Sequence, residues 1–213
     1  MISFSLQKSI KYRFLKLSVS LFTSGIYTMK TILIFVTTLD GKITRWGDPM
    51  IRSWSSQTDQ AYFDAIWNSY RVIIMGSGTY SPAPLKPDSK HLYIVLTSRP
   101  EMYKNAEVPG HLEFTNDTPS NLLERIRKTK EETVLIVGGA QIATSFLREK
   151  LIDELWLTIE PRIFGTGGCF VTEEELDINL NLINITKAND EGTLLTKYKV
   201  LHGISRCEQD TPR

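Results

Sequence analysis

A pair of glycines stands between an apolar run and a segment with helical periodicity, in VLIVGGAQIATSFL at residues 134–147. Glycine lacks a Cβ atom, so Gly138 and Gly139 let another group come close to the backbone. The first turn of the following helix, where Ala140 stands, offers free N–H groups and the positive end of the helix dipole. This joint predicts an anion-binding site, although tight packing of the helix on its strand would explain two glycines equally well.

Four other apolar runs of the sequence also lead into small or polar residues. Short apolar runs that alternate with helical segments are typical of a parallel sheet. In such a sheet, ligands bind beyond the carboxyl ends of the strands. We therefore expect these segments to meet the glycine pair at one binding site. The segments are TTLDGKI (37–43), MGSGTY (75–80), LTSRP (96–100) and TIEP (158–161).

The elements that must position these residues follow from apolar periodicity and turn signals. Ala61, Ile66 and the aromatic residues are expected on the inner face of the first helix. The pattern predicts one α/β domain with a mostly parallel central sheet and an antiparallel C-terminal hairpin. The expected strands are 30–38, 71–76, 91–98, 134–137, 153–164, 180–188 and 193–201, and the expected helices are 56–70, 119–129 and 140–147.

The composition, with 41% apolar and 23% charged residues, is that of a globular protein with a sizeable core. Lys and Arg total 25 against 24 Asp and Glu, so the net charge gives no reason to expect nucleic acid or a membrane surface as partner. Two cysteines and three histidines without ligand spacing predict no metal site, and they fit a reducing compartment such as the cytoplasm.

Residues 1–29 are Ser-rich and basic and contain no acidic residue. This is typical of a transit peptide to an organelle, and it fits equally well a translated stretch ahead of a later start at Met29. The apolar part is broken by Lys16 and is too short to span a bilayer. We expect an unstructured or targeting-like extension over 1–29, one domain over 30–203 and a disordered tail over 204–213.

Four motifs, in this order, resemble the dihydrofolate reductase superfamily: LDGKI, IIMGSGTY, LIVGGAQIATSFL and EPRIFGTGG. The resemblance covers about residues 30–202. It is greatest to the C-terminal reductase domain of the bacterial bifunctional deaminase-reductases of riboflavin biosynthesis. It implies the three-layer α/β fold of that superfamily, in which helices cover both faces of the sheet.

The resemblance also implies NADPH as the cofactor. The N–H groups of Gly138, Gly139 and Ala140 would face the pyrophosphate, and Arg99 would bind the 2'-phosphate of the adenosine as a charge-assisted fork. The folate enzymes usually carry Arg at the place of Ser77. The residues implied to bind the cofactor are Gly76, Ser77, Gly78, Thr79, Ser98, Arg99, Gly138, Gly139 and Ala140.

The riboflavin branch implies one set of substrate residues. Asp40 and Lys42 follow the first strand, where that branch meets its ribosyl phosphate substrate. Lys42 would hold the phosphate, and Asp40 would bond the sugar hydroxyls or steady the loop. A tight Asp-Gly turn is the structural alternative for Asp40.

The folate branch implies a different set. Trp54, Asp59 and Phe63 have the spacing of its Trp, acidic and Phe residues on the first helix, and Thr158 falls where a Thr stands beside that acid. Asp59 would then anchor an aminopyrimidine ring, with burial raising its pKa towards proton donation. The riboflavin reductases do not keep this acid, so a plain helix-start role for Asp59 is the alternative.

We therefore expect an NADPH-dependent reductase that transfers hydride to C1' of a ribosylaminopyrimidine phosphate, with Asp40, Lys42 and Asp59 as catalytic residues. A dihydrofolate or pteridine reductase and a non-catalytic nucleotide-binding module are the alternatives. The resemblance further implies a homodimer. The expected substrate-binding residues are Thr38, Asp40, Lys42, Trp54, Asp59, Thr158 and Glu160.

Overall fold

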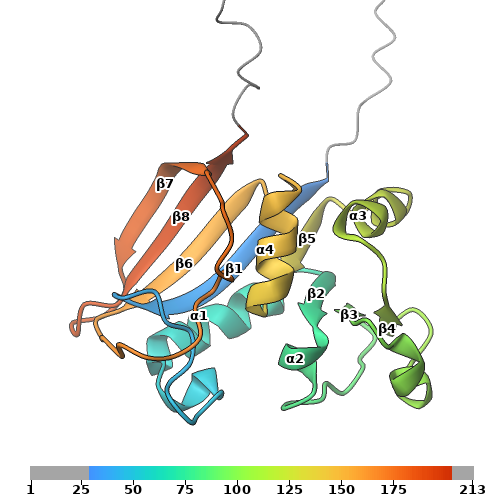
Figure 1. Cartoon of the computed structure of the whole chain (residues 1–213), viewed down its shortest axis with the longest axis horizontal. Helices are drawn as coiled ribbons and strands as arrows, with labels where there is room; N and C mark the ends of the chain where they lie inside the picture. Colours follow the sequence, from blue (N-terminus) through green and yellow to red (C-terminus); the bar gives the residue numbers. More distant parts are fainter. Residues whose placement is uncertain (1–28, 203–213) are drawn as a thin grey trace, which may run out of the picture.

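The structure is a computed structural model that describes residues 29–202, built around one eight-stranded sheet (Figure 1). The strand order is β4-β3-β2-β5-β1-β6-β8-β7. The expectations for an N-terminal extension and a C-terminal tail lie outside the described residues, apart from Met29, whose side chain is buried in the core. The strands are β1 (Lys30–Thr38), β2 (Val72–Gly76), β3 (Leu92–Leu96), β4 (Leu112–Thr115), β5 (Thr133–Ile136), β6 (Glu154–Glu160), β7 (Asn179–Lys187) and β8 (Leu194–Leu201).

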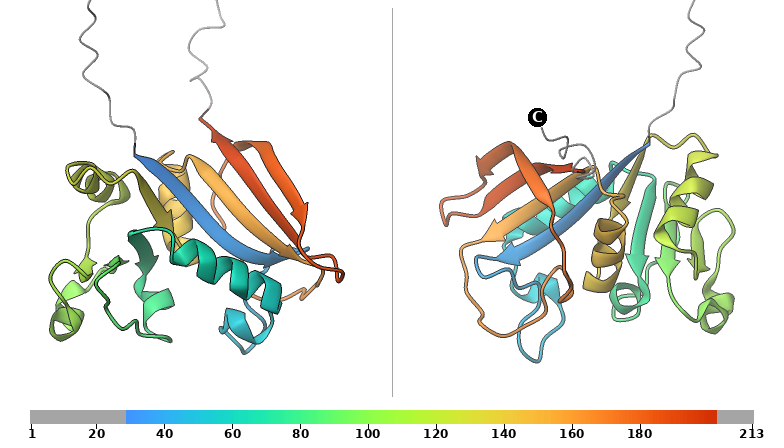
Figure 2. Two further views of the ribbon diagram at one scale, coloured as in Figure 1. Left: turned by 180° about the vertical axis from the view of Figure 1, so that it is seen from behind. Right: turned by 45° about the horizontal axis from the view of Figure 1, so that its top comes forward.

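The six strands from β4 to β6 in this order are parallel, and β8 and β7 extend the sheet in antiparallel fashion (Figure 2). Strands β1, β2 and β5 are almost wholly buried because helices cover both of their faces. The predicted sheet type and the hairpin are both confirmed. The helices are α1 (Gln57–Trp67), α2 (Ser77–Tyr80), α3 (Pro119–Arg127) and α4 (Ala140–Arg148), with 3-10 segments at Ile51–Ser53 and Pro100–Ala106.

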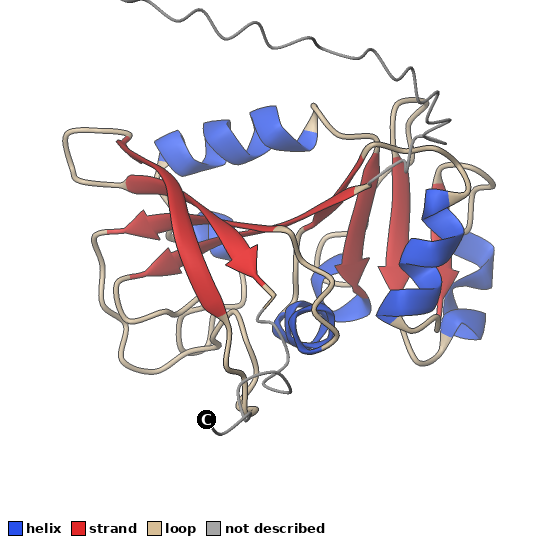
Figure 3. Cartoon of the chain, turned by 90° about the horizontal axis from the view of Figure 1, so that it is seen from above, coloured by secondary structure: helices blue, strands red, loops and turns tan. Residues whose placement is uncertain are grey.

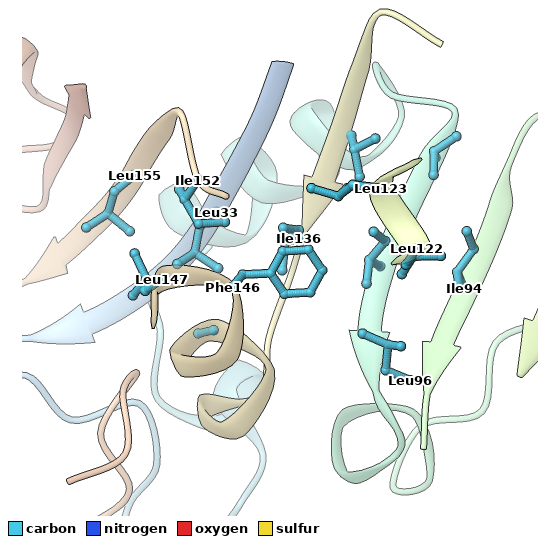
Figure 4. Close-up of a cluster of buried hydrophobic side chains, with 14 of the residues drawn as sticks. Leu33, Ile94, Leu96, Leu122, Leu123, Ile136, Phe146, Leu147, Ile152 and Leu155 are labelled. Atoms are coloured by element: carbon cyan, nitrogen blue, oxygen red, sulfur yellow. The ribbon is translucent and has the colours of Figure 1, made fainter. Parts of the chain in front are cut away.

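Helices lie on both faces of the sheet, so the fold has three layers (Figure 3). On one face, α3 and α4 pack over the strands. Phe146 of α4 is fully buried there, beside Leu33 of β1 and Ile136 of β5, and Leu122 and Leu123 of α3 continue the same cluster (Figure 4). Packing of this kind fixes α4, and with it the first turn of α4 at the carboxyl ends of the strands.

The other face is covered by α1, whose position depends on aromatic side chains. Tyr62, Phe63, Ile66 and Trp67 pack against Ile32, Ile34, Ile73 and Trp156 of the sheet. The expectation that Ala61 belongs to this face is wrong, because Ala61 is exposed. The inner face follows a spacing of three and four residues from Asp59, and Ala61 falls outside that stripe.

Strand β4 was not expected from the sequence, and neither were the short helix α2 and the two 3-10 segments. Strand β4 has only four residues and pairs with β3 at the edge of the sheet, after the 3-10 segment. Its alternation of Leu112, Glu113, Phe114 and Thr115 is too short to stand out as a strand pattern. Because β4 was missed, the residues that follow it were missed as well.

Candidate active site

The carboxyl ends of β3, β2, β5, β1 and β6 lie along one edge of the sheet, because these strands are parallel neighbours. The five predicted segments therefore do meet at one edge. Their order along it separates two regions. The ends of β3, β2 and β5 surround one region, which we call the dinucleotide cleft after the cofactor expected from the sequence. The ends of β1 and β6 form the other region, which we call the substrate end because the expected substrate residues lie there.

The dinucleotide cleft has a volume of about 690 Å³. It lies between Gly76–Thr79 on one side and the start of α4 on the other. Of the predicted cofactor residues, Gly138 and Arg99 are not among those that line it. The cleft is lined by Gly76, Ser77, Gly78, Thr79, Leu96, Thr97, Ser98, Asn116, Asp117, Pro119, Gly139, Ala140, Gln141, Ile142 and Ser145.

Sequence reasoning missed the part of this lining that follows β4, namely Asn116 and Asp117. It also missed Gln141 and Ser145, which stand one helical turn apart on α4. The helical spacing of this pair was a usable signal. Asn116 and Asp117 had no such signal, because only the pairing of β4 with β3 brings them to the cleft.

The first turn of α4 gives the cleft its anion-binding character. The N–H of Ala143 donates to the carbonyl oxygen of Gly139 at 3.0 Å, which is the first helical hydrogen bond. The N–H groups of Ala140, Gln141 and Ile142 precede it and have no carbonyl partner within the helix. Together with the helix dipole, they suit a diphosphate group.

The glycines around the cleft serve two different purposes. Gly138 has φ +115°, and a Cβ atom there would lie 3.1 Å from Cε1 of Phe35, so backbone conformation and packing both require glycine. Gly139 has φ −73°, and a Cβ atom would meet only Oγ1 of Thr79, at 3.4 Å. The structure itself leaves room for a side chain at Gly139, and that room opens into the cleft.

Hydrogen bonds join the residues predicted around the loop that follows β1, which we call the first loop. The carboxylate of Asp40 accepts hydrogen bonds from Thr38 Oγ1 at 2.5 Å and from the N–H groups of Phe164 and Gly165 at 3.2 and 2.7 Å. The hydrogen bond from Thr38 and those from the backbone lower the pKa of Asp40 to about 2. Asp40 thus ties the first loop to the loop after β6, as the steadying role would require.

Lys42 lies opposite Cys169 in an antiparallel bridge, with its Nζ 3.3 Å from Sγ of Cys169. The Thr38 hydroxyl accepts the N–H of Lys42 at 2.9 Å, which places the start of this side chain. Within residues 29–202, no carboxylate forms an ion pair with Lys42. Its positive charge is therefore available to an anionic group of a substrate.

Asp59 occupies the third position of α1, but its carboxyl group does not cap the helix. The N–H of Asp59 donates to Ser56 Oγ at 3.1 Å, whereas the N–H of Ser56 donates to Glu160 Oε1 at 2.8 Å. A reciprocal capping box would need Asp59 in the place of Glu160. The Asp59 side chain is buried instead, 4% exposed, beside Thr158. Its place in the first turn of α1 still puts its carboxyl group near the positive end of the helix dipole, so the helix-start alternative stays open.

Two carboxyl groups share this buried region. Glu160 is held by Ser56 and by the hydroxyl of Thr193, which donates to Glu160 Oε2 at 2.7 Å. Burial raises the pKa of Asp59, and the negative charge of Glu160 adds to the rise, while a hydrogen bond from Thr158 opposes it. The two acids are therefore held differently: Glu160 is bound to the start of α1 and to Thr193, whereas Asp59 is buried and its pKa is raised.

Trp54 lies next to this region and is almost completely buried. Its ring packs edge-on against Phe164 at 5.1 Å between centroids. The indole Nε1 of Trp54 has no hydrogen-bond partner among the described residues. An unpaired buried donor of this kind is costly unless a ligand or a water accepts from it.

The buried carboxyl of Asp59 predicts a pH effect on stability. Because its folded-state pKa is raised, the protein loses stability as pH rises from the ordinary value of 3.8 through the folded-state pKa. Asp59→Asn removes this loss. Urea unfolding between pH 4 and pH 8 measures the free energy of unfolding of both proteins. The value for the variant should increase relative to that of the wild-type protein as pH rises, and the difference should then stay constant. A difference that moves in favour of the wild-type protein with rising pH would contradict the raised pKa.

Known proteins of similar sequence identify the family of this chain. Residues 29–194 match the RibD C-terminal domain. The chain belongs to the RibD C-terminal domain family. Among curated proteins, it is 26% identical over 170 residues to the uncharacterized protein YwjB of Bacillus subtilis (strain 168), covering 77% of this chain and 90% of YwjB. The resemblance drawn from the four motifs is thereby confirmed.

Solved structures show that this RibD C-terminal domain has the expected fold. A pyrimidine reductase-like protein of Corynebacterium diphtheriae superposes with a TM-score of 0.67 and 15% identity, over 82% of this chain and 93% of that one. The riboflavin biosynthesis reductase Rib7 of Saccharomyces cerevisiae gives a TM-score of 0.60 and 15% identity, over 84% and 93%. At these identities the likeness establishes the fold alone.

Two further features are absent from residues 29–202 of this RibD C-terminal domain. No group of three or more His, Cys, Asp or Glu side chains there is arranged to hold a metal ion. No helix there has the length and apolar character needed to cross a membrane.

Proposed function

We propose that this chain is an NADPH-dependent reductase of the type found in riboflavin biosynthesis. The observation on which this rests is the dinucleotide cleft, where unpaired N–H groups at the start of α4 face Gly76–Thr79. The N–H groups of Ala140 and Gln141 would hold the pyrophosphate, and Gly139 would let it approach the backbone. Family membership and the structural likeness to reductases support the same assignment.

The substrate we propose is a ribosylaminopyrimidine phosphate. Lys42, whose charge meets no carboxylate among the described residues, would bind the phosphate. Asp59 would hold the aminopyrimidine ring through its carboxyl group, which can both donate and accept hydrogen bonds when protonated. Asp40 and Thr38 would act as positioning residues, because their bonds shape the loop that presents Lys42.

The bound nicotinamide supplies a hydride, and the protein supplies position and a proton. C1' of the sugar gains the hydride, its bond to the ring oxygen breaks, and that oxygen takes a proton, so the sugar opens to a ribityl chain. Asp59, with its raised pKa, is the candidate proton source. Its burial keeps bulk water away from the proton that it holds.

The direct test is consumption of NADPH with the ribosylaminopyrimidine phosphate, followed by absorbance of the reduced nicotinamide. Lys42→Ala should raise KM for this substrate about tenfold or more, because a charge-assisted phosphate contact is lost. Lys104→Ala, at an exposed position away from the substrate end, should leave KM unchanged. NADPH binding without turnover of any pyrimidine or pterin would favour a non-catalytic nucleotide-binding module.

A second candidate function, reduction of dihydrofolate or another pterin, is favoured by one observation. Asp59 is buried beside Thr158, which is the arrangement that the folate-branch spacing implied. A pterin carries the same aminopyrimidine edge but no ribosyl phosphate. Turnover of dihydrofolate that does not depend on Lys42 would therefore select this candidate.

We further propose that the protein is a homodimer formed along β7. This strand of nine residues is a sheet edge and exposed along its whole length. Leu180, Leu182 and Ile185 share one face of it, and Ile183 stands at a bulge; all four are 41–53% exposed. A long apolar edge of this kind normally has a partner.

Light scattering should therefore give about twice the single-chain mass of 24.3 kDa. Replacing Leu182 with Lys, which puts a charge on the apolar face, should yield a folded monomer. Asn181→Lys places the same charge on the opposite face of β7 and should leave the dimer intact. A wild-type mass near 24.3 kDa would exclude the dimer.

A further inference from the structure

Asp117 is an acidic residue at the far end of the dinucleotide cleft, and it is not among the residues expected to bind the cofactor. Asp117 follows β4 and lines the cleft together with Thr97 and Ser98, which follow β3. The N–H of Thr97 donates to the carbonyl oxygen of Thr115 at 2.9 Å, so the two strand ends lie side by side. Asp117 and the segment that contains Arg99 therefore belong to the same end of the cleft.

Asp117 is held rigidly by one of its two carboxylate oxygens. Arg125 of α3 donates to Asp117 Oδ2 from Nε at 3.2 Å and from Nη2 at 3.0 Å. The same guanidinium binds both oxygens of Glu113. Two carboxylates share one cation, so this group of three side chains keeps a net negative charge. Oδ1 of Asp117 has no hydrogen-bond partner among the described residues.

Arg99 has the opposite charge to Asp117, and it favours a 2'-phosphate where Asp117 favours a ribose hydroxyl. It is exposed, and its guanidinium forms no hydrogen bond or ion pair within residues 29–202. A free guanidinium attracts a 2'-phosphate. A fixed carboxylate with a free oxygen accepts hydrogen bonds from ribose hydroxyls and repels a phosphate at the same place, which is how an acid at a strand end distinguishes NAD from NADP in dinucleotide folds.

We propose that Asp117 is a specificity residue that accepts a hydrogen bond from the adenosine ribose, so that this cleft takes NADH as well as NADPH. Arg125 is a positioning residue that holds Asp117 in place. The proposal rests on the proposed function, since it assumes that the cleft binds a nicotinamide dinucleotide. The expected selectivity between NADPH and NADH changes accordingly. The attraction of Arg99 for the 2'-phosphate and the repulsion by Asp117 offset each other, so neither cofactor is strongly preferred.

Binding of NADPH and NADH to the full chain, measured by calorimetry without substrate, tests this inference apart from catalysis. For the wild-type protein we expect the two Kd values to agree within tenfold. Asp117→Asn should tighten NADPH about tenfold and weaken NADH slightly, because the repulsion of the phosphate is lost. Arg99→Ala should weaken NADPH about tenfold and leave NADH nearly unchanged.

Glu124→Gln is the matched control. Glu124 is an exposed acid on the same helix as Arg125, pairs with Lys128 and does not line the cleft, so the ratio of the two Kd values should change less than twofold. Wild-type selectivity above a hundredfold, or an unchanged ratio in Asp117→Asn with its melting temperature preserved, would overturn the role of Asp117 alone. Failure of both cofactors to bind the wild-type protein would overturn the proposed function together with this inference.

Discussion

Asp59→Asn is expected to lower turnover by about a hundredfold or more, while the Kd for NADPH stays the same. The amide keeps the shape of the side chain but cannot supply the proton that a buried carboxyl of raised pKa holds. Both proposed substrates present an aminopyrimidine edge, so the loss should appear with either one. Steady-state kinetics and a separate cofactor titration measure the two effects.

The control for this variant is Asp64→Asn on the same helix. Asp64 is exposed and paired with Arg52 on the surface of α1, so its loss should leave turnover within twofold of the wild-type value. A loss of turnover in Asp59→Asn together with a lower melting temperature would indicate misfolding rather than chemistry. Unchanged turnover with both substrates would remove Asp59 from the reaction and leave its burial without a catalytic reason.

Gly139→Val is expected to weaken NADPH binding by about a hundredfold with only a small fall in melting temperature. Without a ligand, a Cβ atom at Gly139 meets only Thr79 Oγ1, at 3.4 Å, so the folded protein tolerates it. With a dinucleotide bound, the side chain would occupy the space where the pyrophosphate approaches the start of α4. Calorimetric titration and thermal unfolding of the same sample test both halves of this expectation.

The neighbouring glycine should behave in the opposite way. Gly138→Ala places a Cβ atom at φ +115° and 3.1 Å from the ring of Phe35, so it should cost about 1–3 kcal/mol of stability. Because Gly138 does not line the cleft, the affinity of the protein that remains folded should change little. Unchanged affinity in Gly139→Val would mean that the glycine pair acts only through packing.

Some features of this protein were determined by the sequence itself, because they depend on local chemistry and short periodicity. Residues 32–36 of β1, and most of β2 and β5, are runs of buried apolar residues, which a doubly covered sheet accommodates. Thr118 and Ser56 accept N–H groups at the starts of α3 and α1, as helix-capping residues do. The four motifs gave the family, which the match over residues 29–194 confirms.

The roles of charged side chains depended on tertiary structure, because a side chain's chemistry is set by neighbours that are distant in sequence. In the sequence, Asp59 and Asp40 look alike, because each is an aspartate with polar neighbours. Only the fold buries Asp59 against β6, 99 residues away at Thr158, and raises its pKa, while it places backbone N–H groups on Asp40 and lowers its pKa to about 2.

The same holds for Asp117, which the sequence did not mark at all. The four residues of β4 are too few to form a periodic pattern, and a strand that short is stable only because β3 supplies its hydrogen bonds. That pairing brings Asp117 to the cleft and Arg125 of α3 to Asp117. Sequence periodicity indicates which residues are buried. The partner of each charged side chain is determined only when the strands pair and the helices pack on the sheet.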